Sequence, residues 1–64
     1  MVKFKVSGWD ETATGSELLV VKGFECPDEA DKAAREMSRE CDWVQVWARE
    51  DNSHTYYING VIAD

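Results

Sequence analysis

The sequence has a single proline, a single histidine and no apolar run longer than residues 18–21. A helix that spans a bilayer needs about 20 apolar residues, so we expect no transmembrane segment. Residues 1–6 alternate lysine with apolar side chains, whereas a signal peptide places a basic cluster before an apolar block. We therefore expect a cytoplasmic protein.

Cysteines are scarce, and their spacing is unsuited to a disulfide or a metal site. Cys26 and Cys41 flank a predicted helix over residues 27–40, which at 1.5 Å per residue holds them about 20 Å apart. A disulfide needs Cα atoms within about 7 Å of each other. The same separation keeps the two cysteines and His54 from converging on a zinc ion. We expect two free thiols, in agreement with a reducing compartment, and no metal site.

Residue patterns that carry catalysis are absent from the sequence. The four glycines lack the spacing of a phosphate-binding loop, and His54 has no partner at a catalytic spacing. Cys26 lies at a predicted helix N-terminus, a position that favours the thiolate, so a small thiol enzyme centred on Cys26 stays an alternative. We predict a protein that is not an enzyme and has no cofactor.

The length of 64 residues is enough for one domain, residues 1–64, with one small core. A domain of this size buries only about 60% of the surface of its unfolded chain. The hydrophobic content of 44%, with three tryptophans, is too high for a disordered chain. The net charge of −6 disfavours nonspecific binding of the whole molecule to nucleic acid or to an anionic membrane.

Period-two alternation of apolar and polar residues predicts strands over residues 2–6 and 42–49. The β-prone residues 54–58 follow a polar turn over residues 50–53 and predict a further strand, paired with 42–49 in a hairpin. Residues 18–24 are apolar on both faces, which is typical of a strand covered by neighbours or lying in an oligomer interface. The polar segment 7–16 is bounded by glycines and predicts a loop. Residues 59–60 are an Asn-Gly turn signal, but the short apolar stretch after them leaves a fifth strand open.

A helix is predicted over residues 27–40, with Pro27 at its first position and two carboxylates in its first turn. Asp28–Lys32 and Asp31–Arg35 form i, i+4 pairs on its solvated side. Its apolar stripe consists of Ala30, Ala33, Ala34, Met37 and Cys41. The predicted fold is α+β: a small β-β-α-β-β domain with one helix packed on one face of a mostly antiparallel four-stranded sheet.

One helix covers only one face of such a sheet, so the other face is open. Alternation places aromatic and basic residues on that face, with one of the two tyrosines at 56 and 57 beside them, a composition typical of binding interfaces. In the alternative interpretation, the tryptophans fold over neighbouring strand residues beneath the lysine stems. The predicted partner-binding residues are Trp9, Trp43, Gln45, Trp47, Arg49 and Tyr57.

Trp9 has two interpretations, either as an anchor on a recognition loop or as a side chain that closes one end of the core. For the whole chain we predict a protein-binding module, an inhibitor or adaptor, whose partner is another protein or a second copy. Phages and other mobile elements make small acidic proteins of this kind to bind host proteins. The alternatives are a single-stranded nucleic-acid binder that uses the open face, and a DNA mimic that uses the acidic helix.

Overall fold

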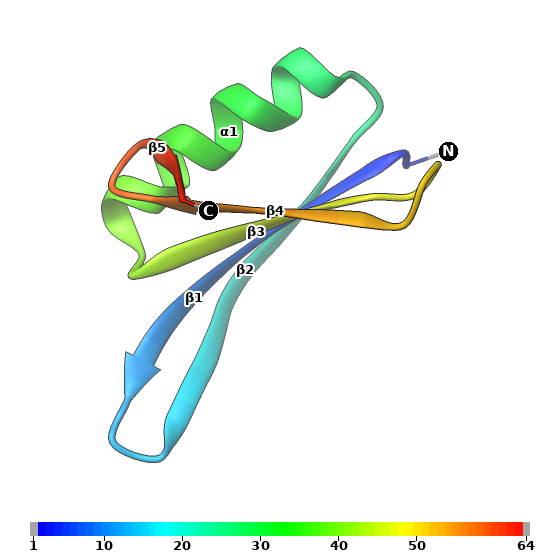
Figure 1. Ribbon diagram of the computed structural model, residues 1–64. Coiled ribbons are helices and arrows are strands. Elements are labelled where there is room, and N and C mark those ends of the chain that lie inside the picture. Colours follow the sequence, from blue (N-terminus) through cyan, green and yellow to red (C-terminus); the bar gives the residue numbers. More distant parts are fainter. Residues whose placement is uncertain (1, 64) are drawn as a thin grey trace.

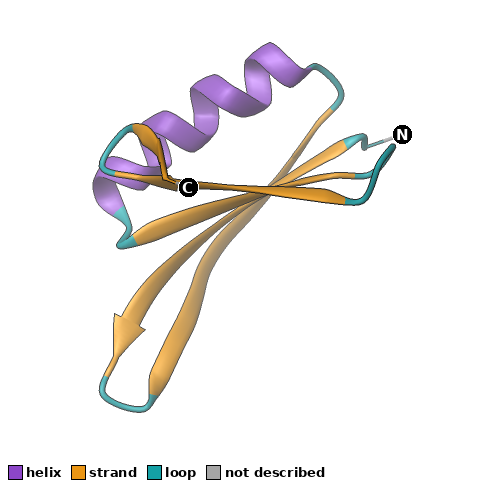
Figure 2. Cartoon of the chain, viewed as in Figure 1, coloured by secondary structure: helices purple, strands orange, loops and turns teal. Residues whose placement is uncertain are grey.

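The chain forms one helix and five strands in a computed structural model that describes residues 2–63. The elements in chain order are β1 (Phe4–Thr12), β2 (Gly15–Phe24), α1 (Pro27–Glu40), β3 (Trp43–Ala48), β4 (Ser53–Ile58) and β5 (Val61–Ala63). The helix lies across one face of the sheet, and the β1–β2 hairpin projects beyond it (Figures 1 and 2).

The sheet has the strand order β2-β1-β3-β4-β5, and each neighbouring pair is antiparallel. The chain passes from β2, at one edge, through α1 to β3 on the far side of β1. The longest strand, β2, therefore has only one neighbour, and the other edge is the short strand β5. The predicted one-helix, antiparallel α+β arrangement is confirmed, but the sheet has five strands and not four.

The core lies between α1 and the central strands. It consists of Val6, Ala30, Ala34, Met37, Val44, Val46 and Tyr57. Small side chains on the helix allow a close approach to the sheet. Gly8 of β1 has no side chain at a point where Cys41, the C-cap residue of α1, and Val20 of β2 both come close. A Cβ atom there would lie 2.9 Å from Cys41 Sγ and 3.0 Å from Val20 Cγ1. The predicted helix span is confirmed at both ends.

The segment 7–16, which we predicted to be a loop, instead belongs almost entirely to β1 and β2. Only Ala13 and Thr14 form the turn between the two strands. Residues 11–19 are exposed because this part of the hairpin extends past the helix. A strand without a buried face has no hydrophobic alternation, so its sequence resembles that of a loop.

The fifth strand forms because the Asn-Gly turn reverses the chain directly after β4. Asn59 and Gly60 have φ values of 51° and 83°, the left-handed conformation that the two central residues of a type I′ hairpin turn require. The turn is also held to the helix, since the Gly60 N–H donates to Ser38 Oγ at 2.7 Å. This hydrogen bond to α1 fixes the turn that leads into β5, a strand of only three residues.

Candidate functional site

The sheet face opposite α1 is not covered by any element of residues 2–63. The strand register places β1, β3 and β4 side chains in rows across this face, because directly paired residues point to the same side. One row contains Lys5, Trp47 and His54, the next Ser7, Gln45 and Tyr56, and the third Trp9 and Trp43. Strand alternation adds Ile58, two residues after Tyr56.

The aromatic side chains at one end of this face form a stack. The rings of Trp9 and Trp43 are 5.3 Å apart between centroids and nearly parallel, at 5°. Tyr56 lies next to Trp43, with a centroid distance of 6.0 Å and an interplanar angle of 52°. We call Trp9, Trp43, Tyr56 and Ile58 the aromatic patch. Stacking limits the freedom of these rings before any partner binds.

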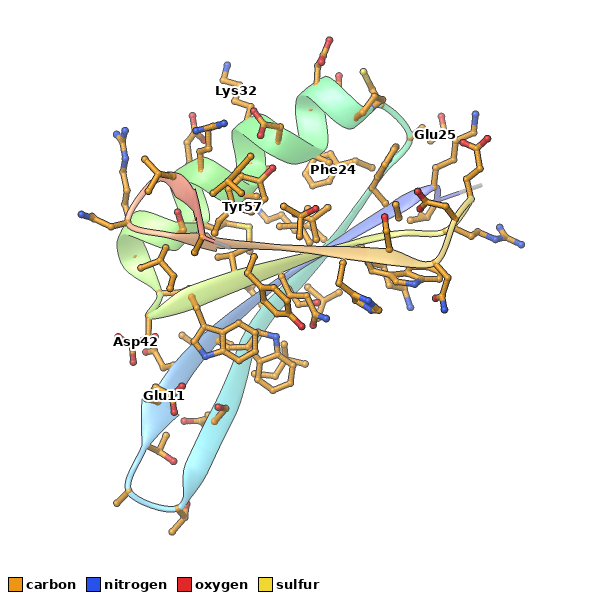
Figure 3. All side chains as sticks on the ribbon, viewed as in Figure 1. Glu11, Phe24, Glu25, Lys32, Asp42 and Tyr57 are labelled. Atoms are coloured by element: carbon orange, nitrogen blue, oxygen red, sulfur yellow. The ribbon has the colours of Figure 1, made fainter. Side chains whose placement is uncertain are left out.

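Carboxylates border the aromatic patch and hold it in place. Trp43 Nε1 donates to Glu11 Oε1 at 3.2 Å. The Glu11 N–H donates to Asp42 Oδ2 at 2.7 Å, and the Asp42 N–H donates to Asp10 Oδ1 at 2.8 Å. Glu11 and Asp42 lie together where the hairpin leaves the sheet (Figure 3). These bonds fasten β1 to the start of β3 and make this end of the face acidic.

A shallow hollow of about 310 Å³ opens to solvent beside the stack. Glu11, Trp43, Tyr56 and Ile58 line it. Tyr56 and Ile58 are 44% and 47% exposed, so much of their apolar surface is available for contact. The hollow therefore combines apolar walls with one carboxylate at its rim.

The other end of the open face is organised around Trp47. Its Nε1 donates to Asn52 Oδ1 at 2.7 Å, and Lys5 Nζ lies 6.0 Å from the centre of its ring. The lysine distance is at the outer limit of a cation–π contact. Trp47 is thus fixed by its own hairpin, and the Lys5 ammonium lies over its ring at the limit of contact.

Of the six predicted site residues, four lie on the open face: Trp9, Trp43, Gln45 and Trp47. Arg49 follows β3 and is exposed, and its N–H donates to the Lys3 carbonyl at 2.9 Å. Trp9 lies in a strand and not in a loop, and it stacks on Trp43 on the open face, apart from the residues of the core. Whether these residues bind a partner stays a prediction.

Placing Tyr57 on the open face was wrong, since Tyr57 points toward the helix and is only 5% exposed (Figure 3). Register decides this, because Tyr57 pairs with Val44 of the core while Tyr56 pairs with Gln45 of the open face. Two adjacent tyrosines give no alternation signal of their own. Glu11 and Ile58, which line the hollow, were missed, although Ile58 follows Tyr56 at the period of a strand.

Tyr57 instead joins β4 to the helix through a hydrogen bond from its hydroxyl to Asp31 Oδ1 at 2.7 Å. Asp31 also forms the expected ion pair with Arg35, at 3.0 Å, and Arg35 donates to the Gly60 carbonyl. Burial, followed by the bond to Asp31, raises the pKa of Tyr57 to about 12. The Tyr57 bond, followed by the Arg35 bond, lowers the pKa of Asp31 below its ordinary value.

Both cysteines are free and half-buried, one at each end of α1. Cys26 is the N-cap residue, and its side chain makes no capping hydrogen bond. Burial, and then the nearby carboxylates Asp10, Glu40 and Asp42, raise the pKa of the Cys41 thiol above its ordinary value. Within residues 2–63, no group of three or more histidine, cysteine or acidic side chains is arranged to hold a metal ion.

Comparison with protein-family models, with curated proteins and with solved structures finds no match to this chain. In the part of the chain that the structure describes, no helix has the length and apolar character needed to cross a membrane.

Proposed function

We propose that this chain is a small protein-binding module that docks through the aromatic patch on the open face of its sheet. The observation that carries the proposal is the parallel stack of Trp9 on Trp43, with Tyr56 beside it, on a face that no element of residues 2–63 covers. Tryptophan and tyrosine are enriched among the residues that dominate binding energy at protein interfaces.

Rigidity makes the aromatic patch suited to binding. Trp43 is held on one side by Trp9 and at its indole nitrogen by Glu11. Ordering a flexible side chain at an interface costs about 0.5–1.5 kcal/mol, and a ring that is already fixed avoids much of this cost. The aromatic patch therefore needs little rearrangement of its rings when a partner binds.

Charge defines the chemistry of the partner. Glu11 lies at the rim of the hollow, and hydrogen bonds connect it to Asp42 and, through Asp42, to Asp10. The expected partner is a protein surface that inserts an apolar side chain into the hollow and places an arginine or lysine beside Glu11. The net charge of −6 further favours encounter with a basic surface.

The same carboxylates argue against a single-stranded nucleic acid at the aromatic patch. The Glu11 carboxylate is bound to the Trp43 indole, so a nucleic acid whose base stacks on Trp43 would meet a negative charge beside the ring, which repels its phosphates. Lys5 beside Trp47 is the feature of the open face that resembles a nucleic-acid binder. Salt dependence distinguishes the two classes, because phosphate contacts make the logarithm of the affinity fall steeply with the logarithm of salt concentration.

Site-specific photocrosslinking tests the proposal. A photoreactive phenylalanine analogue replaces the exposed Tyr56 in one protein and the exposed helix residue Glu36 in a matched control. We expect a partner to crosslink in the source cell from position 56 and not from position 36. With that partner purified, Ile58→Lys should weaken binding about 30-fold or more, the scale of a hot-spot change, with an unchanged circular dichroism spectrum.

Equal crosslinking from both positions, or full affinity in the Ile58→Lys protein, would contradict the proposal. A captured oligonucleotide, bound with a steep salt dependence, would establish the nucleic-acid alternative instead.

A further inference from the structure

The outer edge of β2 is the longest unpaired edge of the sheet among residues 2–63. Strand β2 has ten residues and pairs only with β1, whereas the opposite edge strand, β5, has three residues. Leu18, Leu19 and Val21 are 47%, 48% and 47% exposed on β2. A long, apolar edge with free backbone N–H and C=O groups is a template for pairing with another strand. Natural proteins rarely leave such an edge bare.

A β-bulge shapes this edge. The pairing of β1 with β2 shifts register between Gly8 and Trp9, so that Leu19 is the extra residue of β2. As a result, Leu18 pairs with Trp9 and Val21 pairs with Ser7, and both lie on the open face. In a regular strand, residues three apart point to opposite faces. Because of the bulge, residues at equal distances on either side of the midpoint of β2 point to the same face of the sheet.

This equivalence makes β2 complementary to itself. In an antiparallel pair of two β2 strands centred between Leu19 and Val20, Leu18 faces Val21 of the second copy. One position further out, Glu17 faces Lys22 of the second copy. Glu17 and Lys22 both lie on the helix side, since their β1 partners are Asp10 and Val6. Two-fold symmetry thus supplies two opposite-charge pairs, one on each side of the central apolar residues.

The charges on β2 favour this partner over an arbitrary strand. Glu17 pairs with Asp10 within the hairpin, and like charges directly opposite each other destabilise a sheet. Among residues 2–63 neither Glu17 nor Lys22 forms an ion pair. Lys22 of a second copy would lie on the free side of Glu17 and offset its repulsion from Asp10.

We propose that β2 pairs antiparallel with β2 of a second copy of this chain, in the register that sets Glu17 against Lys22, to form one continuous sheet across a two-fold axis. The axis is perpendicular to the sheet, so both helices lie on one side and both aromatic patches on the other. The dimer presents two copies of the patch on one surface. This pairing does not depend on what the patch binds.

A charge-swap series measured by analytical ultracentrifugation tests the pairing. A strand-edge interface is small, so we expect a dimer with a dissociation constant of about 10 μM. Glu17→Lys and Lys22→Glu should each weaken the dimer about tenfold, because each places two like-charge pairs in the interface. The double variant, Glu17→Lys with Lys22→Glu, should restore it. Both residues are exposed, so the monomer fold is expected to persist, as circular dichroism can verify.

Two lysine substitutions with matched exposure serve as controls. Leu19→Lys on β2 should abolish the dimer, whereas Ile62→Lys on β5, which replaces a residue that is 47% exposed, should leave it unchanged. A protein that stays monomeric at about 100 μM, ten times the expected constant, overturns the proposal. So does a double charge variant that fails to dimerise. Loss of the dimer in Ile58→Lys with retention in Leu19→Lys also overturns it, since self-association would then use the aromatic patch.

Discussion

Replacing Tyr57 with phenylalanine removes one hydroxyl from the contact between β4 and α1 and keeps the ring in the core. The hydroxyl donates to a carboxylate at 2.7 Å, the short distance of a charge-assisted hydrogen bond. Such bonds contribute about 1.5–3 kcal/mol. Asp31 keeps 42% of its side-chain surface exposed, so water replaces the lost donor. We therefore expect Tyr57→Phe to lower the free energy of unfolding by only about 1 kcal/mol at pH 8.

The pH dependence of this difference is more diagnostic than its size. The pKa of Tyr57 is raised to about 12 in the folded protein, against about 10 for an unperturbed tyrosine. A raised pKa means that the stabilisation is complete below pH 10 and is lost as the pH rises toward 12. At about 1.4 kcal/mol per pH unit, roughly 1.4 kcal/mol is lost by pH 11. The original protein and the variant should therefore be equally stable near pH 11, and the variant should be the more stable one above it.

Urea unfolding followed by tryptophan fluorescence, at pH values from 8 to 12, measures this difference. Tyr56→Phe is the matched control, because it removes the same hydroxyl group from the neighbouring residue, which is 44% exposed on the open face. We expect the control to match the original protein at every pH. A stability difference between Tyr57→Phe and the original protein that stays constant from pH 8 to 12 would refute the link between Tyr57, Asp31 and the fold.

Three further outcomes follow from the same structure. The difference in unfolding free energy between the original protein and Tyr57→Phe should shrink as the pH falls below about 4. The pKa of Asp31 is lowered in the folded protein, so the stabilisation that its carboxylate provides is lost when it is protonated. Urea unfolding of both proteins at acid pH measures this change. Gly8→Ala should lower the free energy of unfolding by about 1–3 kcal/mol, because its Cβ atom would press on Cys41 Sγ and Val20 Cγ1, and an unchanged melting temperature would contradict this packing. Asp42→Ala should speed hydrogen exchange of the Glu11 amide without affecting core amides, and an unchanged exchange rate at Glu11 would show that its bond to Asp42 does not hold the hairpin.

The helix could be predicted from the sequence because its signals are local. Pro27 at the first helical position and an apolar stripe through Ala30, Ala34 and Met37 specify a start and a buried face, and these three residues of the stripe are indeed buried. The separation of the two cysteines follows from the helix length alone. An open sheet face with Trp43 and Trp47 follows from period-two alternation around the core valines of β3. Each of these inferences needs only neighbouring residues.

Tertiary contacts decided the rest. The outer part of the β1–β2 hairpin, residues 11–19, has strand geometry without a buried face, so it depends on strand pairing and on the bond between Glu11 and Asp42, which are distant in sequence. The stack of Trp9 on Trp43 arises from the register of β1 with β3, and the choice of Tyr57 over Tyr56 for the core arises from the register of β4 with β3. Strand register is set by long-range pairing, and a shift of one residue exchanges the two faces. Local alternation therefore determined that this protein has an aromatic face, and only the folded sheet determined which aromatic residues form it.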